Sequence, residues 1–426
     1  MQTNLDPKIL QSGPAAEVDS ILRKCVHCGF CNATCPTYQI LGDELDGPRG
    51  RIYQMKLFFE GEAANAEMLK HLDRCLGCRS CETTCPSGVR YSRLLEIGRE
   101  AIEEALPRPA WDRIRRWAIV RFINSARIFS FSITCARVLS PLLPAKLRRS
   151  IPPRQPGLAR ISARQERKVL LLPGCVQSFL TPNTNIALNN VLQRLGIETI
   201  EVANWQCCGA TALHTSEPEY GLAQARQIID SWWPYIESGA EAILVSASGC
   251  GVTVKDYARM LADDAEYADK ATTISELYRD PVELVEQEIE KLDLPAANRI
   301  RVAFHTPCTL QHGLGLNHRV ETMLEHLGYE ICAVTDAHLC CGSAGTYSML
   351  QVELSTRLRE NKQACLTADR PDVIATANIG CQLHLAQGLD IPVRHWIELI
   401  DQALARISHQ EPGTAIPPPG EKCGLS

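Results

Sequence analysis

The sequence has no run of eighteen uncharged apolar residues, so it predicts no transmembrane helix. Its first residues lack the basic segment and apolar run of a secretory signal peptide, which favours a cytoplasmic location. No Gly-x-Gly-x-x-Gly follows a predicted strand and no Walker loop occurs, so we expect no binding site for NAD, FAD or ATP. The net charge of −5 gives no indication of nucleic-acid binding.

Cysteine is in clear excess, with 20 residues in a chain of 426. Such an excess indicates disulfides in a short secreted chain and metal ligation in a long intracellular one. This chain is long and is expected in a reducing compartment, so we interpret the cysteines as thiolate ligands of metal. The length also predicts two or three domains.

Eight cysteines form two copies of Cys-x-x-Cys-x-x-Cys-x-x-x-Cys-Pro, offset by 50 residues. Three cysteines spaced by two residues can surround one four-iron cluster, while the fourth, before proline, ligates the other cluster. Paired zinc ribbons are the alternative, which the fourth cysteines and prolines disfavour. The expected sets are Cys25, Cys28, Cys31 and Cys85 for the first cluster, and Cys75, Cys78, Cys81 and Cys35 for the second.

The segment around these motifs predicts helices, notably over 51–60 and 92–106, where apolar residues recur at helical spacing. Long helical connections between the motifs resemble the α-helical ferredoxin module of the succinate dehydrogenase and heterodisulfide reductase type. Arg49 and Arg51 lie between the motifs. For them we favour a solvated helix N-terminal turn over hydrogen bonds to cluster ligands or carbonyls.

A second repeat, with a period of about 130 residues, occupies 167–410. Each copy has a cysteine, then Cys-Cys-Gly after 31 residues, then a last cysteine after 41 or 39 more. Apolar strands alternate with helices, which predicts α/β units with parallel strands and ligands beyond the strands' carboxyl ends. The candidate ligands are Cys175, Cys207, Cys208 and Cys250 in the first copy, and Cys308, Cys340, Cys341 and Cys381 in the second.

These copies resemble the cysteine-rich Cys-Cys-Gly family, which includes a subunit of heterodisulfide reductase and the iron–sulfur subunits of glycolate oxidase and anaerobic glycerol-3-phosphate dehydrogenase. The family motif ends in Cys-x-x-Cys, whereas Ala247 and Asn378 stand here at the earlier position. This departure argues against a five-thiolate noncubane cluster. Three readings stay open for each copy: a cubane cluster, another metal or degenerate site, or a metal-free structural site.

Histidines lie near the cysteines of the second copy, at positions 305, 312 and 338. Imidazole can ligate a cluster or donate hydrogen bonds to its sulfurs. We favour the plainer interpretation, in which these side chains cap helices or make hydrogen bonds in the core.

The connecting segment 108–168 contains fifteen Lys or Arg and two acidic residues. Within 111–139, Trp111, Ile114, Phe122 and Phe129 fall near one helical face, with Arg113, Arg116 and Arg127 largely off it. Two interpretations stay open: a helix lying in a membrane interface against anionic headgroups, or a helix packed on the second domain or on a partner.

The expected architecture is an N-terminal α-helical two-cluster ferredoxin domain followed by two tandem α/β Cys-Cys-Gly repeats. Its parts are 1–107, a basic helical linker over 108–166, the repeats over 167–295 and 296–410, and a flexible tail over 411–426.

The whole chain resembles most the iron–sulfur subunit of glycolate oxidase. That resemblance implies two [4Fe-4S] clusters, with two more if the repeats hold cubanes, and FAD-binding partner subunits that oxidise glycolate to glyoxylate. Electrons would pass on to a quinone or another acceptor, at the inner face of the cytoplasmic membrane if the linker binds lipid. No residue here would act as an acid, base or nucleophile. The alternatives are an electron-transfer subunit for lactate or glycerol-3-phosphate oxidation, or a heterodisulfide-type thiol–disulfide reductase.

Overall fold

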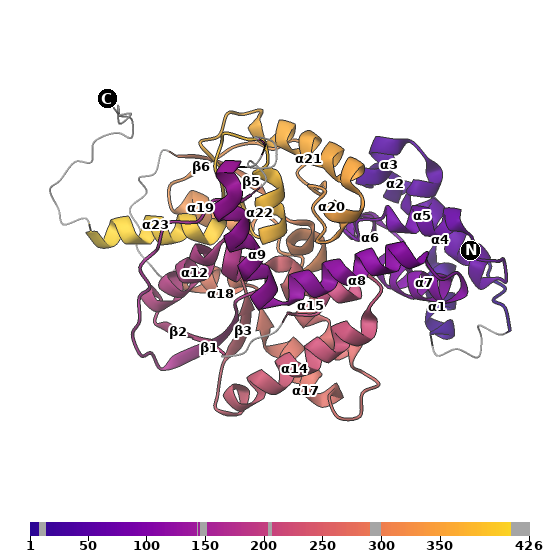
Figure 1. The fold of residues 1–426 in the computed structure, drawn as a ribbon, viewed down its shortest axis with the longest axis horizontal. Coiled ribbons are helices and arrows are strands. Elements are labelled where there is room, and N and C mark those ends of the chain that lie inside the picture. The colour runs from indigo at the N-terminus through magenta and orange to yellow at the C-terminus, as the bar shows by residue number, and fades with distance from the viewer. Residues whose placement is uncertain (8–13, 143, 145–150, 203–206, 290–299, 410–426) are drawn as a thin grey trace.

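The computed structural model describes residues 1–7, 14–142, 144, 151–202, 207–289 and 300–409. A helical N-terminal part lies at one end of the molecule, and two α/β units form most of the rest (Figure 1). The fold class expected from the sequence is therefore confirmed. The expected boundary between the two repeats, at residues 295 and 296, and the expected tail over 411–426 lie outside the described residues.

Short helices separated by the cysteine loops build the N-terminal part. They are α1 (Ala15–Lys24), α2 (Phe30–Ala33), α3 (Pro36–Leu41), η2 (Glu44–Asp46), α4 (Pro48–Phe59), α5 (Ala66–Asp73), α6 (Ser80–Thr84) and α7 (Tyr91–Ala105). Helices α3 and α4 begin at prolines, which have no backbone N–H to leave unpaired in a first turn. Leu22, Met55, Leu72 and Leu94 meet in one buried core. The helices expected over 51–60 and 92–106 are confirmed as α4 and α7.

Two parallel four-stranded sheets of the same topology form the second part. The first has the order β2-β1-β3-β4, with β1 (Arg167–Leu172), β2 (Ile197–Glu201), β3 (Ala242–Val245) and β4 (Tyr278–Arg279). The second has the order β6-β5-β7-β8, with β5 (Arg301–His305), β6 (Glu330–Ile331), β7 (Val373–Thr376) and β8 (Val393–His395). The central strands β1, β3, β5 and β7 are almost entirely buried, as expected for parallel strands covered on both faces.

Helices cover both sheets. In the first repeat these are α11 (Gln177–Leu180), α12 (Pro182–Arg194), α13 (Ala210–Leu213), α14 (Pro218–Glu237), α15 (Ser248–Lys255), α16 (Tyr257–Met260), α17 (Ala268–Leu277) and α18 (Pro281–Ile289). In the second they are η4 (Thr309–Gly313), α19 (Arg319–His326), α20 (Tyr347–Leu350), α21 (Val352–Thr367), α22 (Ile379–Leu385) and α23 (Trp396–His409). The helices expected to alternate with the strands of each repeat are confirmed, among them α12, α14, α19 and α21.

The two repeats share one hydrophobic core. Leu171 and Leu188 of the first repeat lie in the same buried cluster as Phe304, Val320 and Ile400 of the second. Helix α12 packs against α23, and α18 packs against α19, so each repeat places its last helix against the first long helix of the other. This mutual packing fixes the two sheets relative to each other, and it therefore also fixes the groups at their strand ends.

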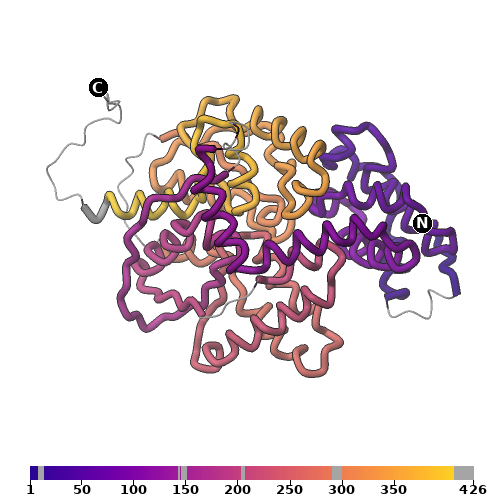
Figure 2. The backbone as a smooth tube through the Cα atoms, viewed as in Figure 1, coloured from indigo at the N-terminus to yellow at the C-terminus, as the bar shows by residue number. Residues whose placement is uncertain are grey.

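Two helices connect the parts, α8 (Ala110–Asn124) and α9 (Ala126–Leu139), followed by the short turn η3 (Ser140–Leu142). Ser125 breaks the expected single helix because its backbone is extended and its side chain caps α9 by accepting from the Ile128 N–H. Figure 2 shows α8 running from the helical part across the repeats. No described helix has both the length and the apolar character needed to cross a membrane.

The inner side of α8 and α9 packs on the second part, which confirms one of the two interpretations of the linker for that side. Phe129 is buried between Phe122 and Phe179, with ring centroids 5.5 and 6.0 Å away. The guanidinium of Arg121 stacks 3.5 Å from the ring centroid of Tyr220.

Arg116 lies off the face of Trp111 and Ile114, as the sequence predicts, but it is not exposed to solvent. Its side chain is buried, and its guanidinium donates 3.0 Å hydrogen bonds to Asp73 and Asp112. A charge removed from water needs such partners. Conversely, Trp111 and Ile114, which share the expected apolar face with Phe129, point outward and are 66% and 64% exposed.

Candidate metal centres

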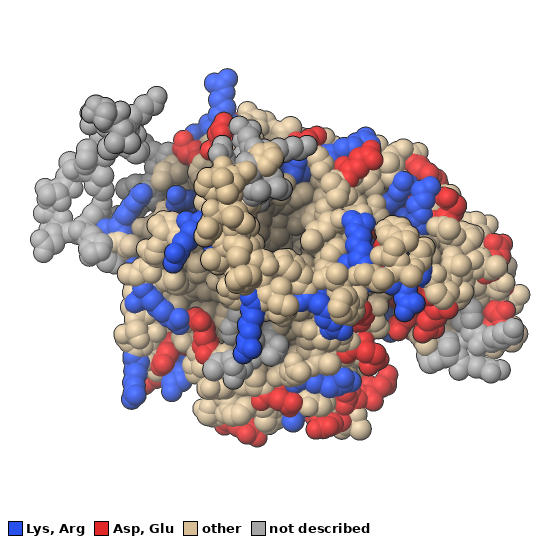
Figure 3. Space-filling model, viewed as in Figure 1, with Lys and Arg blue, Asp and Glu red and all other residues tan. Residues whose placement is uncertain are grey.

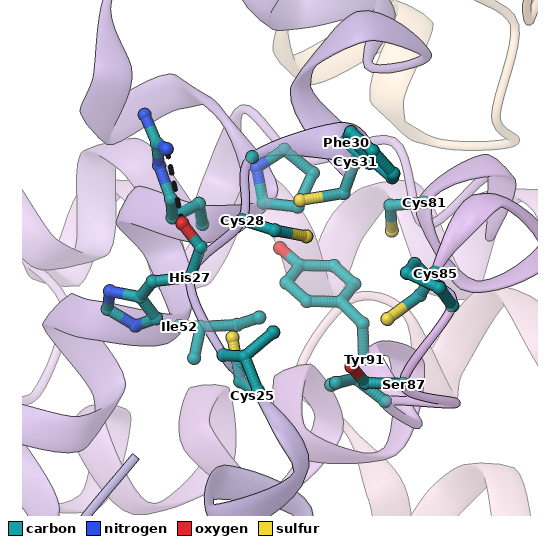
Figure 4. A pocket seen from close by; sticks show the side chains of 16 residues that line it. Cys25, His27, Cys28, Phe30, Cys31, Ile52, Cys81, Cys85, Ser87 and Tyr91 are labelled. Atoms are coloured by element: carbon teal, nitrogen blue, oxygen red, sulfur yellow. Dashed lines mark hydrogen bonds between the residues drawn. The ribbon is translucent and has the colours of Figure 1, made fainter.

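The first group of candidate ligands surrounds a common space in the N-terminal part. Cys25, Cys28, Cys31 and Cys85 line one cavity, and their sulfur atoms point into it (Figure 4). Cys85 comes from the second cysteine motif, so the structure brings together the crossed set that the sequence assigns to the first cluster. Cys81 also reaches the wall of this cavity, which places the two sites side by side.

The second group has the complementary composition. Cys35 lies with Cys75, Cys78 and Cys81 around a neighbouring cavity. The sulfur of Cys75 accepts hydrogen bonds of 3.5 Å from the Tyr91 hydroxyl and from the backbone N–H of Gly77. Hydrogen bonds of this kind stabilise the charged form of a thiolate, which is the form that binds iron.

The loops that carry the cysteines share an unusual backbone. His27 and Gly29 of the first motif have φ of 55° and 86°, and the matching residues Gly77 and Arg79 of the second have 65° and 62°. Left-handed conformations cost energy in residues other than glycine and gather at functional sites. Their recurrence at both matched positions indicates that each loop needs this path to curl around its cavity.

The electrostatics of the two cavities fit a bound metal. Burial, with the neighbouring charges of Cys25 and Cys85, raises the pKa of Cys31 to about 11. Burial likewise raises the pKa of Cys78 and Cys81 well above the usual range. Thiols in such surroundings ionise only when a cation neutralises them, so cluster binding would release protons.

Arg49 and Arg51 donate hydrogen bonds to backbone carbonyls, whereas the sequence favoured solvated side chains for both. The guanidinium of Arg51 is buried and donates a 2.7 Å hydrogen bond to the carbonyl of His71. That of Arg49 donates to the carbonyl of His27 over 3.3 Å. Burial alone would raise the pKa of Cys75, but the charges of Arg51 and Arg99 outweigh it and hold that pKa below its usual value.

Four thiols gather in the first repeat, beyond the carboxyl ends of its strands. The sulfurs of Cys175 and Cys207 are 3.7 Å apart. Contact with Cys207, together with burial, raises the pKa of Cys175. Contacts with Cys175 and Cys208 lower the pKa of Cys207, and Cys208 in turn contacts Cys250.

The second repeat brings together the matching thiols. The sulfurs of Cys308 and Cys340 are 4.0 Å apart, Cys340 contacts Cys341, and Cys341 contacts Cys381. All four predicted side chains of each repeat therefore lie in one group.

The glycine of each Cys-Cys-Gly turn has a left-handed backbone conformation. Gly209 and Gly342 have φ of 87° and 88°. A Cβ atom would approach the carbonyl oxygen of Gly221 to 2.6 Å in the first case and that of Ser355 to 2.8 Å in the second. Only glycine allows both this backbone and this close approach.

The second ferredoxin site lies next to the second repeat. Helix α6 packs against η4, and the charge of Cys308 adds to burial in raising the pKa of Cys78. Thr83 and His312 share a 2.8 Å hydrogen bond across this interface, and the Tyr347 hydroxyl donates to the carbonyl of Arg74 over 3.2 Å. Three of the four thiol groups therefore form a continuous series, from the first ferredoxin cavity to the second and then to the second repeat.

Sequence reasoning assigned no contact to two side chains around the second repeat's site. Lys362 is buried in the chain interior, and its ammonium donates to the carbonyls of Asp336 and Ala337 at 2.6 and 3.4 Å. The Asn378 amide donates to the sulfur of Cys381 over 3.6 Å. Neither has a motif of its own, although the replacement of a family cysteine by asparagine was a visible signal.

Known families match most of the chain. Residues 21–89 match the 4Fe-4S dicluster domain, and residues 169–255 and 302–386 match the cysteine-rich domain. Each match spans the cysteine groups described above. Iron–sulfur clusters are therefore the cofactors of this chain, which confirms the expected cofactor class.

Individual proteins resemble the chain over different lengths. A hypothetical protein from Helicobacter pylori shares the fold, with a TM-score of 0.51 and 10% identity over 94% of this chain and 74% of its own. Lactate utilization protein A of Bacillus velezensis is 24% identical over 55% of this chain and 99% of its own length. The glycolate oxidase iron–sulfur subunit of Escherichia coli is 51% identical over 95% of this chain and 100% of its own length. The chain belongs to the family of glycolate oxidase iron–sulfur subunits.

Proposed function

We propose that this chain is the electron-transfer subunit of a flavin-dependent complex that oxidises glycolate to glyoxylate. Partner subunits with FAD would remove two electrons from the substrate, and this chain would pass them to a quinone or another acceptor. The observation that carries the proposal is the grouping of sixteen cysteines into four sets, three of them adjoining in series. The high identity to a glycolate oxidase subunit supports glycolate over lactate, since the lactate-utilisation relative matches just over half of the chain.

The ligand sets follow from the thiol groups. The ferredoxin clusters would be held by Cys25, Cys28, Cys31 and Cys85, and by Cys75, Cys78, Cys81 and Cys35. The repeats would hold further clusters on Cys175, Cys207, Cys208 and Cys250, and on Cys308, Cys340, Cys341 and Cys381. Bound clusters supply one-electron redox chemistry. The chain's own side chains exclude water from the sulfurs, donate hydrogen bonds to them, and place positive charge beside them.

Contact with a membrane surface would bring the chain to a quinone. The outer side of α8 and α9 carries large exposed apolar side chains, which are Trp111, Ile114, Trp117, Ile128 and Phe131. Figure 3 shows basic side chains interspersed with uncharged ones on the face that these helices cross. Aromatic rings beside arginines suit the interface of an anionic bilayer. We therefore place the protein peripherally on the inner face of the cytoplasmic membrane.

The test is a gentle affinity purification of the chain from its native cells, followed by dye-reduction assays with glycolate, lactate and glycerol-3-phosphate. Co-purifying flavoprotein and reduction by glycolate alone would support the proposal. Reduction by another substrate would keep the electron-transfer role and overturn the choice of glycolate. If no flavoprotein co-purifies and the pre-reduced chain reduces a disulfide substrate, the chain is a thiol–disulfide reductase instead.

A further inference from the structure

His305 is buried without a hydrogen-bond partner for its ring. It is the last residue of β5, and its side chain is 2% exposed. Within the described part of the chain, neither Nδ1 nor Nε2 of this imidazole has a partner. Leaving a buried polar group unpaired is unfavourable, so an imidazole in this position is expected to have a ligand.

The ring faces two thiols of the second repeat's site. A ring nitrogen of His305 and the sulfurs of Cys341 and Cys381 all lie within 4.8 Å of one another. No hydrogen bond joins the ring to either sulfur among the described contacts. Metal bonds of about 2.0–2.1 Å to imidazole and about 2.3 Å to thiolate suit a metal at that position, as in a mixed Cys and His site.

The first repeat provides an internal comparison. Leu172 ends β1 as His305 ends β5, and both precede the first cysteine of their repeat by three residues. The two strands pair with β3 and β7 in the same register, with Leu172 opposite Val245 and His305 opposite Thr376. Leucine therefore satisfies the packing at this place in the fold, and the histidine has another purpose.

The second repeat also differs at the position where the family has its additional cysteine. Asn378 donates a hydrogen bond to Cys381 there, whereas Ala247 in the first repeat has no side-chain donor. The Cys381 sulfur thus has both the amide of Asn378 and the imidazole of His305 near it. The second repeat thus offers five candidate metal ligands, which are four thiols and one imidazole, and the first repeat offers four thiols.

We propose that His305 is a nitrogen ligand of the metal centre in the second repeat, and that the centre of the first repeat has thiolate ligands only. This inference rests on the proposed function in requiring a metal centre at Cys308, Cys340, Cys341 and Cys381. It replaces the interpretation of His305 as a histidine bonded within the core. His312 does conform to that interpretation, because its ring bonds to Thr83 and to the carbonyl of His338.

The test is pulsed electron paramagnetic resonance on the complete complex, purified anaerobically from cells grown with ordinary or ¹⁵N-labelled histidine. Samples are poised stepwise from oxidised to fully reduced, so that the centres become paramagnetic in turn. A strong coupling to a directly bound nitrogen is expected, and it should change to the ¹⁵N pattern on labelling. The coupling should be lost in His305→Leu, which copies Leu172, and kept in His312→Leu.

A diamagnetic metal such as zinc gives no paramagnetic signal, so this case needs metal analysis. If the second repeat holds zinc, zinc-edge X-ray absorption should show a nitrogen neighbour that His305→Leu replaces by sulfur or removes, and this result also supports the ligand. The labelling experiment needs no variant, so it remains decisive if His305→Leu fails to fold.

Thiolate-only coordination in the unaltered protein would overturn the inference, as would a second repeat without metal. Neither result depends on the substrate assay, so a failure of the glycolate proposal can be distinguished from a failure of the ligand assignment.

Discussion

The guanidinium of Arg51 lies 4.0 Å from the sulfur of Cys35, inside the wall of the second ferredoxin cavity. The side chain is 1% exposed, and it also contacts the Thr37 hydroxyl at 3.2 Å and the Asp46 carboxylate at 3.5 Å. Arg51 therefore places a permanent positive charge beside the thiolates proposed to hold the second cluster. Such a charge favours the reduced, more negative state of a cluster.

Replacing Arg51 by methionine should lower the reduction potential of the second ferredoxin cluster. A hydrogen bond to a charged group contributes about 1.5–3 kcal/mol. Since about 1.4 kcal/mol corresponds to about 59 mV for one electron, the expected fall is on the order of 60–130 mV. A redox titration followed by electron paramagnetic resonance measures it. Asp46 keeps Arg74 and His71 as partners at 2.8 and 2.9 Å, so the site should still fold.

Arg49→Gln provides the matched control. Arg49 lies beside the first cavity, where it bonds to the carbonyl of His27 and to Glu44. Its replacement should shift the reduction potential of the first cluster and leave that of the second cluster unchanged within error. Equal shifts of both clusters in each variant would show that the arginines act through general destabilisation rather than through local charge.

The iron content tests the ligand sets of the repeats. Four cubane clusters require about sixteen irons per chain, whereas the ferredoxin pair alone requires about eight. If all four sets hold cubanes, Cys208→Ser and Cys341→Ser should each reduce the iron content of anaerobically purified protein by about four. Cys135→Ser, which lies outside the four groups, should leave the content unchanged. Retention of full iron in both repeat variants would contradict the assigned sets.

Cysteine spacing predicted the sites because each ligand motif has a fixed spacing that recurs along the chain. The crossed position of Cys85 and the gathering of the Cys-Cys-Gly thiols both follow from motifs read along the chain. Alternating strands and helices likewise predicted parallel sheets with ligands at their carboxyl ends. Each of these features is local or repeated, so it is visible without knowledge of tertiary packing.

Features that depend on packing between distant segments were not predictable in this way. Arg51 and Arg116 have the sequence context of surface residues, and they are buried because the carbonyl of His71 and the carboxylate of Asp73 meet them in space. The exchange of α18 and α23 between the repeats has no sequence signal, since an amphipathic helix does not specify which apolar surface it covers. The break at Ser125 was missed because serine is tolerated within helices as well as at their N-caps.

Acidification should weaken the junction between the repeats at His395. The Nε2 atom of His395 donates to the carbonyl of Ser246 in the first repeat over 2.9 Å, and Nδ1 accepts from the Ile397 N–H. Burial lowers the pKa of His395 from 6.5 to about 4. Between these values the unfolded chain binds a proton that the folded chain does not, so stability falls as pH falls from about 6.5 to about 4.

The size of this effect is about 3 kcal/mol, because each unit of pKa shift corresponds to about 1.4 kcal/mol. Urea unfolding at several pH values, followed by tryptophan fluorescence under anaerobic conditions, measures it. His395→Gln retains a donor for Ser246 and does not titrate, so its stability should fall less steeply over the same range. Loss of cluster sulfide in acid affects both proteins alike. Parallel pH profiles would therefore refute a contribution from His395.

Replacing Trp111 and Trp117 together by glutamate should weaken binding to vesicles that contain anionic lipid. These side chains are 66% and 53% exposed, so the change disturbs little packing within the chain. Removal of two apolar anchors costs at least about 3 kcal/mol of binding free energy, or roughly a hundredfold in affinity. Added salt should weaken the unaltered protein as well, because screening reduces the attraction between arginines and headgroups. Sedimentation with vesicles measures both effects.

Leu45→Glu is the control for this double variant, since Leu45 is 40% exposed on the helical part, away from α8 and α9. It should bind vesicles as the unaltered protein does. If the double variant also keeps its vesicle binding, the exposed strip of α8 and α9 does not contact the membrane. If it instead loses the co-purifying flavoprotein while vesicle binding persists, the strip is the surface on which the partner subunits dock, and the aromatic side chains serve protein association rather than lipid contact.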